Sequence, residues 1–229
     1  MSLSEPAPGN DPAGFLAPGE FVDSHHPAVV DFAQRHRSAG EDSVRTAIRL
    51  YLAVRDEILY DPYQVGPDPR YFRASDCLLA GSGFCIPKAA LLAACARVAG
   101  IPARVGYADV RNHLSTEKLD ELTGGNVYTW HSFTDLYLEG RWVKATPAFN
   151  ASLCERFGVH VLEFDGRTDS LFQEFNRAGH RHMEYVRQRG VFADVPYERI
   201  LADFERHHPK WLHHRADLED PEFGHRADG

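Results

Sequence analysis

Apolar residues recur at helical spacing in an early segment of the chain. They are three or four positions apart from Val44 onwards, and the acidic, cap-forming run Glu-Asp-Ser at 41–43 precedes them. This spacing places apolar side chains on one face of a helix, and a cap-forming residue is typical of a helix start. The pattern predicts an amphipathic helix that ends before Asp61. Residues 61–80 are rich in Pro, Gly, Asp and Tyr, which predicts a long loop.

A second helix is predicted over 85–99. The Gly-Ser-Gly run at 81–83 precedes it, Gly100 stands in the position that follows a helix, and a proline lies just beyond. Its charged residues are Lys88 and Arg97, so the helix is apolar on nearly all sides. A helix with this pattern belongs in the centre of a domain.

The middle of the chain has the pattern of an antiparallel sheet. Residues 103–110 predict a strand, and 112–126 a polar connection. Polar and apolar side chains then alternate over 130–138, which is the period of a strand. Glu139-Gly140 is a two-residue turn, so 141–146 is expected to return as the antiparallel partner.

The rest of the chain has a less regular sequence pattern, and the elements predicted there are the following. They comprise a strand over 159–164, helices around 177–189 and 197–206, a flexible N-terminal arm over 1–20, and a loose His- and charge-rich tail over 207–229. A single catalytic domain over 21–206 remains between the two ends, within the usual size of a domain.

Composition narrows the class of protein. With 229 residues, 43% hydrophobic and 25% charged, the chain is an ordinary globular protein. Its net charge of −8 repels phosphate backbones and anionic membranes, so neither nucleic acid nor membrane is an expected partner. The longest apolar run, 89–96, is too short to span a bilayer, and the first residues lack the pattern of a secretory leader. A cytoplasmic location is expected, and the oligomeric state stays open.

The chemistry-bearing residue of the central helix is Cys85. Its position at the helix start exposes it to the positive end of the peptide dipoles, which favours thiolate, and the unpaired N–H groups there can hold an oxyanion. The alternative is that Cys85 is only a small core residue. The other cysteines, Cys77, Cys95 and Cys154, form no Cys-x-x-Cys pair and are interpreted as buried free thiols.

His131, near the start of the second predicted strand, is the candidate base. The Glu139-Gly140 turn sets a register in which Ala148 is opposite His131, with Thr146 and Asn150 as diagonal neighbours. A polar group to orient the imidazole is therefore within reach. The alternative is a structural histidine that bonds a backbone carbonyl.

Two long segments carry a resemblance to a known family. GSGFCIPKAALLAACARVAGIPARVGY and WHSFTDLYLEGRWVKATPAFN resemble the core of bacterial transglutaminase-like cysteine peptidases. The shorter VRDEILYDPY and LEFDGRTDS also resemble segments of that group, so the similarity covers about residues 20–205. The resemblance implies an α+β, papain-like fold in which a nucleophile-bearing helix packs on an antiparallel sheet. It maps the nucleophile onto Cys85 and the base onto His131.

The third catalytic position departs from the family pattern. Where an aspartate usually precedes the proline after the Trp-x-x-x step, this chain has Thr146 before Pro147. A threonine hydroxyl can accept the imidazole N–H but carries no charge to stabilise imidazolium. Thr146 is the first candidate on position, and Asn150 and Asp165 are the alternative orienters.

These observations predict a thiol acyl-transfer enzyme. It would hydrolyse or transamidate an amide or peptide bond through a Cys85 thioester, on a peptide, protein or small amide, without a cofactor or a metal. One alternative is a catalytically lapsed fold that binds peptides or proteins. Another is a metal-dependent hydrolase that uses the histidine pairs His25-His26, His180-x-His182, His207-His208 and His213-His214.

Overall fold

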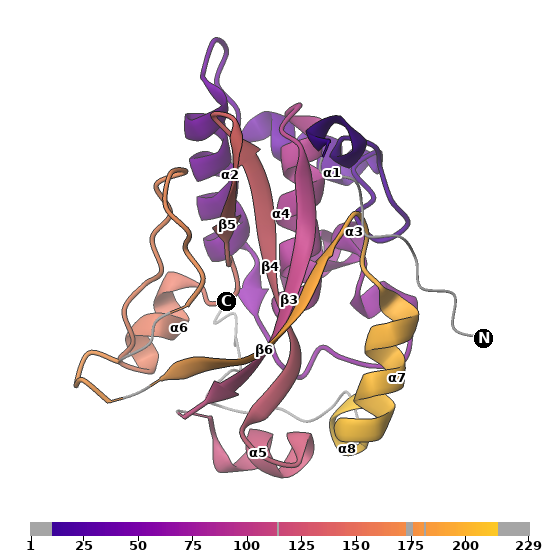
Figure 1. Cartoon of the computed structure of the whole chain (residues 1–229), viewed down its shortest axis with the longest axis vertical. Coiled ribbons are helices and arrows are strands. Elements are labelled where there is room, and N and C mark those ends of the chain that lie inside the picture. Colours follow the sequence, from indigo (N-terminus) through magenta and orange to yellow (C-terminus); the bar gives the residue numbers. More distant parts are fainter. Residues whose placement is uncertain (1–10, 114, 173–175, 181, 215–229) are drawn as a thin grey trace, which may run out of the picture.

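The computed structural model describes residues 11–113, 115–172, 176–180 and 182–214 (Figure 1). The helices are α1 (Pro27–Arg35), α2 (Ser43–Glu57), α3 (Ala74–Ala80), α4 (Cys85–Val98), α5 (Glu117–Thr123), α6 (Ala151–Arg156), α7 (Tyr197–His207) and α8 (Pro209–Leu212), with 3-10 turns η1 (Pro12–Phe15) and η2 (Pro69–Tyr71). The strands are β1 (Leu59–Tyr60), β2 (Ser82–Gly83), β3 (Ala103–Asn112), β4 (Val127–Leu138), β5 (Arg141–Ala145) and β6 (Met183–Phe192).

The predicted core helix lies at the centre of the molecule. Every side chain of α4 from Cys85 to Arg97 is buried. On one side α4 packs against β4 and β3, and on the other against α1, α2 and α3 (Figure 1). A helix without a polar face needs such a cover on all sides. The prediction of a central helix packed on an antiparallel sheet is confirmed.

The sheet has the strand order β5-β4-β3-β6, and each neighbouring pair is antiparallel. The predicted hairpin is present in the predicted register, with Leu138 opposite Arg141 and Thr134 opposite Ala145. Both turn residues, Glu139 and Gly140, have positive φ (48° and 84°), which is the geometry that two-residue hairpin turns favour.

Two of the predicted loops contain short helices. α3 lies within 61–80, and α5 lies within 112–126. The Thr116 hydroxyl accepts a hydrogen bond from the Leu119 N–H at the start of α5, and Gly81 ends α3 in a left-handed conformation. Prolines and glycines around these helices dominate the sequence pattern, and helices of two turns give too little periodicity to stand out against them.

Two elements predicted after β5 are wrong. Residues 159–164 form no strand, and the described residues of 177–189, which leave out 181, contain no helix. The strand β6 begins instead at Met183 and pairs with β3 at the edge of the sheet. Much of β6 is exposed, and its charged residues are compatible with an edge strand. The position of β6 in the sheet depends on its pairing with β3, which no local sequence pattern predicts. The helix predicted over 197–206 is confirmed as α7.

The predicted boundaries of the two ends also differ from the structure. Phe15 is buried, and its ring packs edge-on against Trp142, so the chain joins the domain before residue 21. At the other end α8 follows α7, and Trp211 and Leu212 are buried beyond the predicted boundary at 207. The remainder of the predicted arm and tail, 1–10 and 215–229, lies outside the described residues.

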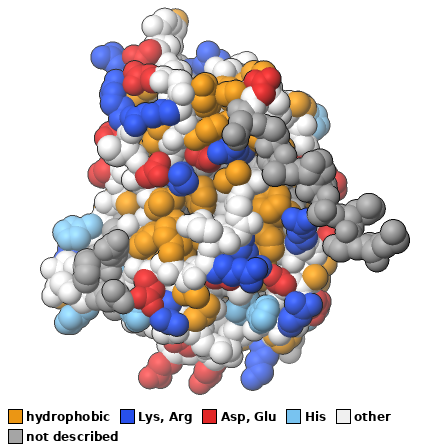
Figure 2. Space-filling view, in the orientation of Figure 1, with side chains coloured by type: hydrophobic (Ala, Val, Ile, Leu, Met, Phe, Trp, Pro, Cys, Tyr) orange, Lys and Arg blue, Asp and Glu red, His pale blue; other side chains and the backbone are white. Residues whose placement is uncertain are grey.

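Charged groups are distributed over the molecular surface. Figure 2 shows acidic and basic side chains interspersed over one face, so the negative net charge does not form a single patch there. None of the helices in the described ranges combines the length and the apolar character that a bilayer crossing requires.

One charge is buried completely inside the domain. The ammonium group of Lys88 on α4 donates hydrogen bonds to the carbonyl oxygens of Arg55 (3.0 Å) and Ile58. These carbonyls stand at the end of α2, where a helix leaves its last acceptors without partners of its own. Lys88 therefore joins the core helix to α2, while burial lowers its pKa to about 7.

Replacing Lys88 with Met is expected to destabilise the fold by about 1–3 kcal/mol, because two buried carbonyls lose their donor. The folded protein holds the Lys88 proton more weakly than the unfolded chain, whose lysine has a pKa of 10.5. Wild-type stability therefore rises with pH from about 7 towards 10.5, and is flat below this range. Denaturant unfolding of both proteins should show this rise, roughly 2 kcal/mol between about pH 7.5 and about pH 9, only in wild type. Parallel pH profiles would contradict the assignment.

Candidate active site

The chain reaches Cys85 through a tightly constrained junction. β2 pairs in parallel with β1 and leads directly into α4, whose first residue is Cys85. Gly83 is required in this junction, since a Cβ atom there would lie 2.8 Å from the Cys77 sulfur and 3.1 Å from Pro87 Cγ. The close approach of α3 and α4 thus fixes the backbone just before the candidate nucleophile.

Burial has the largest effect on the pKa of the Cys85 thiol. Cys85 is 9% exposed, and burial raises its pKa to about 11, although interactions of its sulfur with the backbone N–H groups of Ser132 and Ile86 act in the opposite direction. The sequence led us to expect a thiolate favoured by the helix start. That expectation is wrong for the protein alone, because desolvation outweighs the hydrogen bonds at the helix terminus.

His131 lies on β4 beside this cysteine. The Ser132 N–H that interacts with the Cys85 sulfur belongs to the next residue, and both Cys85 and His131 line one cavity. His131 is 7% exposed, and its pKa is lowered to about 4 by burial first and by the charge of His182 second. The imidazole is therefore neutral near pH 7, as a general base must be before it accepts a proton.

A β-bulge places His131. The pairing of β3 and β4 shifts between Ala108 and Val110, and Trp130, just before His131, has a positive φ of 61°. This conformation is unfavourable for a bulky residue and persists only where the surroundings hold it. The Trp130 N–H donates to the Asp109 carboxylate (3.1 Å), and the indole Nε1 donates to Asp203 (2.9 Å).

Arg189 on β6 ties this bulge together. Its guanidinium donates to both oxygens of Asp109 (2.5 and 3.0 Å) and also to Asp203 on α7. The guanidinium carbon lies 4.6 Å from the centre of the Trp130 ring, a cation–π distance. A network that joins β3, β4, β6 and α7 thus holds the strained residue before His131. The role of Asp109 here is structural.

The cavity that Cys85 and His131 line is narrow. Its walls are largely aromatic and include Tyr60, Phe84 and Phe149, and α7 and α8 contribute Phe204 and Trp211. The Trp211 indole donates to the carbonyl of Pro62 (2.7 Å), which fixes α8 over the cavity. Part of the segment predicted as a loose tail is therefore a wall of the candidate site.

Thr146 lies on the other side of His131. Together with Ala148 and Phe149, the two residues line a second small cavity. Both the Nε2 atom of His131 and the Thr146 hydroxyl oxygen are buried there and have no hydrogen-bond partner among the described residues. Thr146 and His131 thus line one cavity, but the expected hydrogen bond between the Thr146 hydroxyl and the imidazole is not formed in this structure.

The two alternative orienters are engaged elsewhere. The Asn150 side chain accepts from the Tyr60 N–H (3.0 Å) and donates to Ser152 (2.8 Å), and it lines neither cavity of His131. The strand β5 ends at Ala145, so the expected pairing does not continue to Asn150. Asp165 is exposed, and its carboxylate accepts hydrogen bonds from its own loop, including both N–H groups of 167–168. The expectation for Asp165 is wrong.

The histidine pairs form no metal site among the residues that the structure describes, where no cluster of three or more His, Cys, Asp or Glu side chains is suited to hold an ion. Several have other partners: His26 caps α1, and buried His208 bonds the carbonyl of Thr123 (2.7 Å). All four cysteines are free and buried, which is as expected for Cys77, Cys95 and Cys154.

Sequence reasoning missed three parts of this site. Phe204 was predicted only as part of a helix, Trp211 fell in the predicted tail, and His182 was considered only as half of a histidine pair for a metal. His182 is in fact 3% exposed, and its ring stacks on Phe149. No local sequence pattern indicated this burial, and the segment was predicted as a helix.

Comparison with known proteins agrees with this geometry. The family model of the transglutaminase-like superfamily matches residues 30–147, which include Cys85 and His131. A search of curated proteins finds no match. A crystal structure from Cytophaga hutchinsonii, named a "putative cysteine protease", is similar over 81% of this chain and 48% of its own, with 17% identity and a TM-score of 0.50.

The solved structure supports the fold, and this chain spans about half of that protein's length. The expected α+β, papain-like core is confirmed, with a helix that carries Cys85 against an antiparallel sheet that carries His131. The family model covers more than half of the chain, and the chain belongs to the transglutaminase-like superfamily.

Proposed function

We propose that the protein is a cysteine-dependent acyl-transfer enzyme that cleaves an amide bond of a peptide or protein. The observation that carries this proposal is the placement of Cys85 and His131, from α4 and β4, in one aromatic-walled cavity. The N–H groups at the start of α4 are suitable donors for the oxyanion that forms during acyl transfer. The likeness to a protein named as a cysteine protease supports the same reaction class.

The proposed reaction proceeds in two steps. His131 accepts the thiol proton as the Cys85 sulfur attacks the carbonyl carbon, and the C–N bond then breaks as the imidazolium protonates the leaving amine. Water, deprotonated by His131, attacks the resulting thioester, which releases a carboxylic acid and restores the thiol. A second amine in place of water would give transamidation. Hydrolysis is the proposed outcome because the structural relative is named a protease.

The resting pair in this proposal is thiol and neutral imidazole. With the Cys85 pKa near 11 and that of His131 near 4, both groups are uncharged at neutral pH. Proton transfer therefore accompanies attack instead of preceding it. Thr146 is the proposed positioning residue, since its hydroxyl can hold the ring without supplying charge.

A second candidate is a lapsed enzyme that binds peptides. The specific observations in its favour are the raised pKa of Cys85 and the neutral residue at position 146. The experiments below separate the two candidates.

Cys85→Ala should abolish turnover of a peptide amide substrate while it changes the free energy of unfolding by no more than about 1 kcal/mol. The matched control is Cys77→Ala, because Cys77 is also buried but does not line the cavity of His131. Steady-state kinetics and denaturant unfolding measure both effects. Turnover that survives in Cys85→Ala, or electrophile labelling that maps to Cys77, would exclude Cys85 as the nucleophile.

Alkylation of Cys85 by iodoacetamide should accelerate about tenfold per pH unit from about pH 7 to about pH 9, because only the thiolate reacts and the raised pKa keeps it scarce. Intact-mass spectrometry with peptide mapping gives the rate for each cysteine, and Cys85→Ala supplies the background. A plateau through neutral pH would indicate a preformed thiolate–imidazolium pair and overturn the neutral resting state.

Thr146→Val keeps the shape of the side chain, removes its hydroxyl, and should lower kcat/KM by about tenfold, the effect of one hydrogen bond. Thr146→Asp should retain or increase activity and raise the pKa of His131, since a carboxylate stabilises imidazolium. The readouts are kcat/KM against pH and NMR titration of His131. Unchanged activity in Thr146→Val contradicts the positioning role, and activity found only in Thr146→Asp supports the lapsed enzyme.

A further inference from the structure

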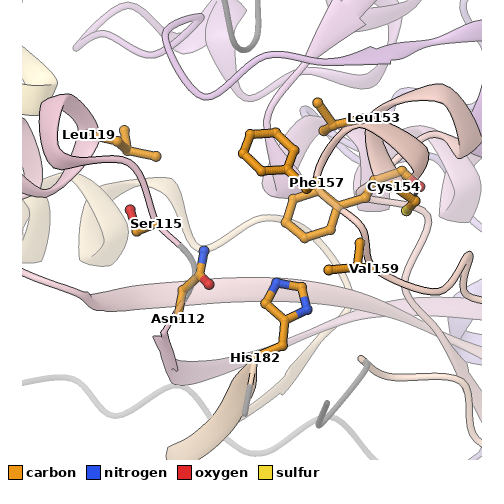
Figure 3. Close-up of a pocket in the computed structure, with 9 residues that line it drawn as sticks. Asn112, Ser115, Leu119, Leu153, Cys154, Phe157, Val159 and His182 are labelled. Carbon is orange, nitrogen blue, oxygen red and sulfur yellow. Dashed lines mark hydrogen bonds between the residues drawn. The ribbon is translucent and has the colours of Figure 1, made fainter. Parts of the chain in front are cut away.

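A further narrow pocket lies beside the cavity of Cys85 and His131, which is called the catalytic cavity below; this further pocket is called the side pocket. Figure 3 shows Leu119 and Ser115 on one side, Leu153 and Phe157 on the other, and His182 between them, with Asn112 next to it. The remaining walls are Phe149, Cys154 and Val159. The elements α5, α6 and β6 therefore meet around this pocket.

The side pocket and the catalytic cavity share walls. Asn112, Leu119 and Phe149 line both. The Phe149 ring packs edge-on against Tyr60 of the catalytic cavity (4.7 Å) and stacks on His182 of the side pocket (6.1 Å). A substrate held at Cys85 thus has a neighbouring space for one of its side chains.

The lining of the side pocket favours an uncharged occupant. None of its described lining residues is Asp, Glu, Lys or Arg, and most are apolar. A charged side chain would lose its hydration without gaining an ionic partner, which is costly. An aromatic chain would instead be surrounded by the rings of Phe149 and Phe157 and by aliphatic groups.

One polar atom in the side pocket lacks a partner. His182 is 3% exposed, and its Nδ1 atom has no hydrogen-bond partner among the described residues. A buried polar atom in this state costs free energy until a ligand satisfies it. A hydroxyl group suits either tautomer of a neutral imidazole, because it both donates and accepts hydrogen bonds.

We propose that the side pocket binds the side chain on the acyl side of the cleaved bond and selects an uncharged aromatic chain that bears a hydroxyl group. The tyrosyl side chain has this chemistry. The assignment to the acyl side of the cleaved bond rests on the proposed function. The assignment of a binding pocket rests on the walls that it shares with the catalytic cavity and on the Nδ1 atom of His182.

The experiment uses two kinds of probe. N-acetyl amides of tyrosine, phenylalanine, glycine, lysine and glutamate test the pocket by calorimetric titration, without any chemistry. The corresponding N-acetyl chloromethyl ketones test Cys85 by the rate of alkylation. The tyrosine amide should bind about tenfold more tightly than the phenylalanine amide, the effect of one hydrogen bond. The lysine and glutamate amides should bind no better than glycine.

Variants connect this preference to the side pocket. Val159→Phe fills it from a buried position that does not line the catalytic cavity, and should weaken binding of the tyrosine amide at least tenfold. Val159→Leu is a smaller change for the case in which Val159→Phe does not fold. His182→Phe should remove the difference between tyrosine and phenylalanine. Val186→Phe, at an exposed position of β6, is the matched control and should change nothing.

The outcomes distinguish the two proposals. Equal binding of the tyrosine and phenylalanine amides, or affinity unaffected in a folded Val159 variant, overturns the side-pocket proposal. Absence of Cys85 alkylation by the glycine chloromethyl ketone overturns the proposed function, while the titrations still decide the pocket. Faster alkylation by the tyrosine reagent than by the glycine reagent, lost in Val159→Phe, supports both.

Discussion

Complete burial of α4 is the constraint on which the rest of the structure depends. A helix without a solvent face needs partners all round, and here the sheet and the helices α1, α2 and α3 supply them. Its two charged side chains must also be satisfied inside the protein. Lys88 bonds the end of α2, and Arg97 bonds the carbonyls of Ala17, Ala103 and Ala193. Cys85, the first residue of this helix, has no freedom to move independently.

The same burial determines the chemistry. It places Cys85 against Ser132 of β4, next to His131, but it also removes the water that would stabilise a thiolate or an imidazolium. Cys85 and His131 are therefore held in position while both side chains remain uncharged. In the reaction proposed above, a substrate would bring a polar carbonyl into the cavity, and the charge that develops during attack would fall near the N–H groups at the start of α4.

Those parts of the arrangement that a local sequence pattern determines could be predicted from the sequence. The apolar run of α4, its flanking glycines and the Glu139-Gly140 turn predicted the helix and the hairpin, and with them the positions of Cys85 and His131. The edge strand β6 was not predictable in this way, because its sequence is largely polar and its strand conformation depends on pairing with β3. The raised pKa of Cys85 was also missed, because the depth of a side chain depends on elements far along the chain, α7 and α8 among them.

The network around Trp130 affects when the site can be completed during synthesis of the chain. Trp130 is held in its strained conformation by Arg189 of β6 and Asp203 of α7, both of which are synthesised long after β4. Until those segments emerge, the hydrogen bond from the Trp130 N–H to Asp109 of β3 lacks the support of Arg189, and the strained conformation is held less firmly. The Cys85 helix precedes β4 in the chain, whereas His131 reaches its place only after β6 and α7 have been synthesised. The proposed catalytic pair of Cys85 and His131 is therefore complete only once these later segments have joined the fold.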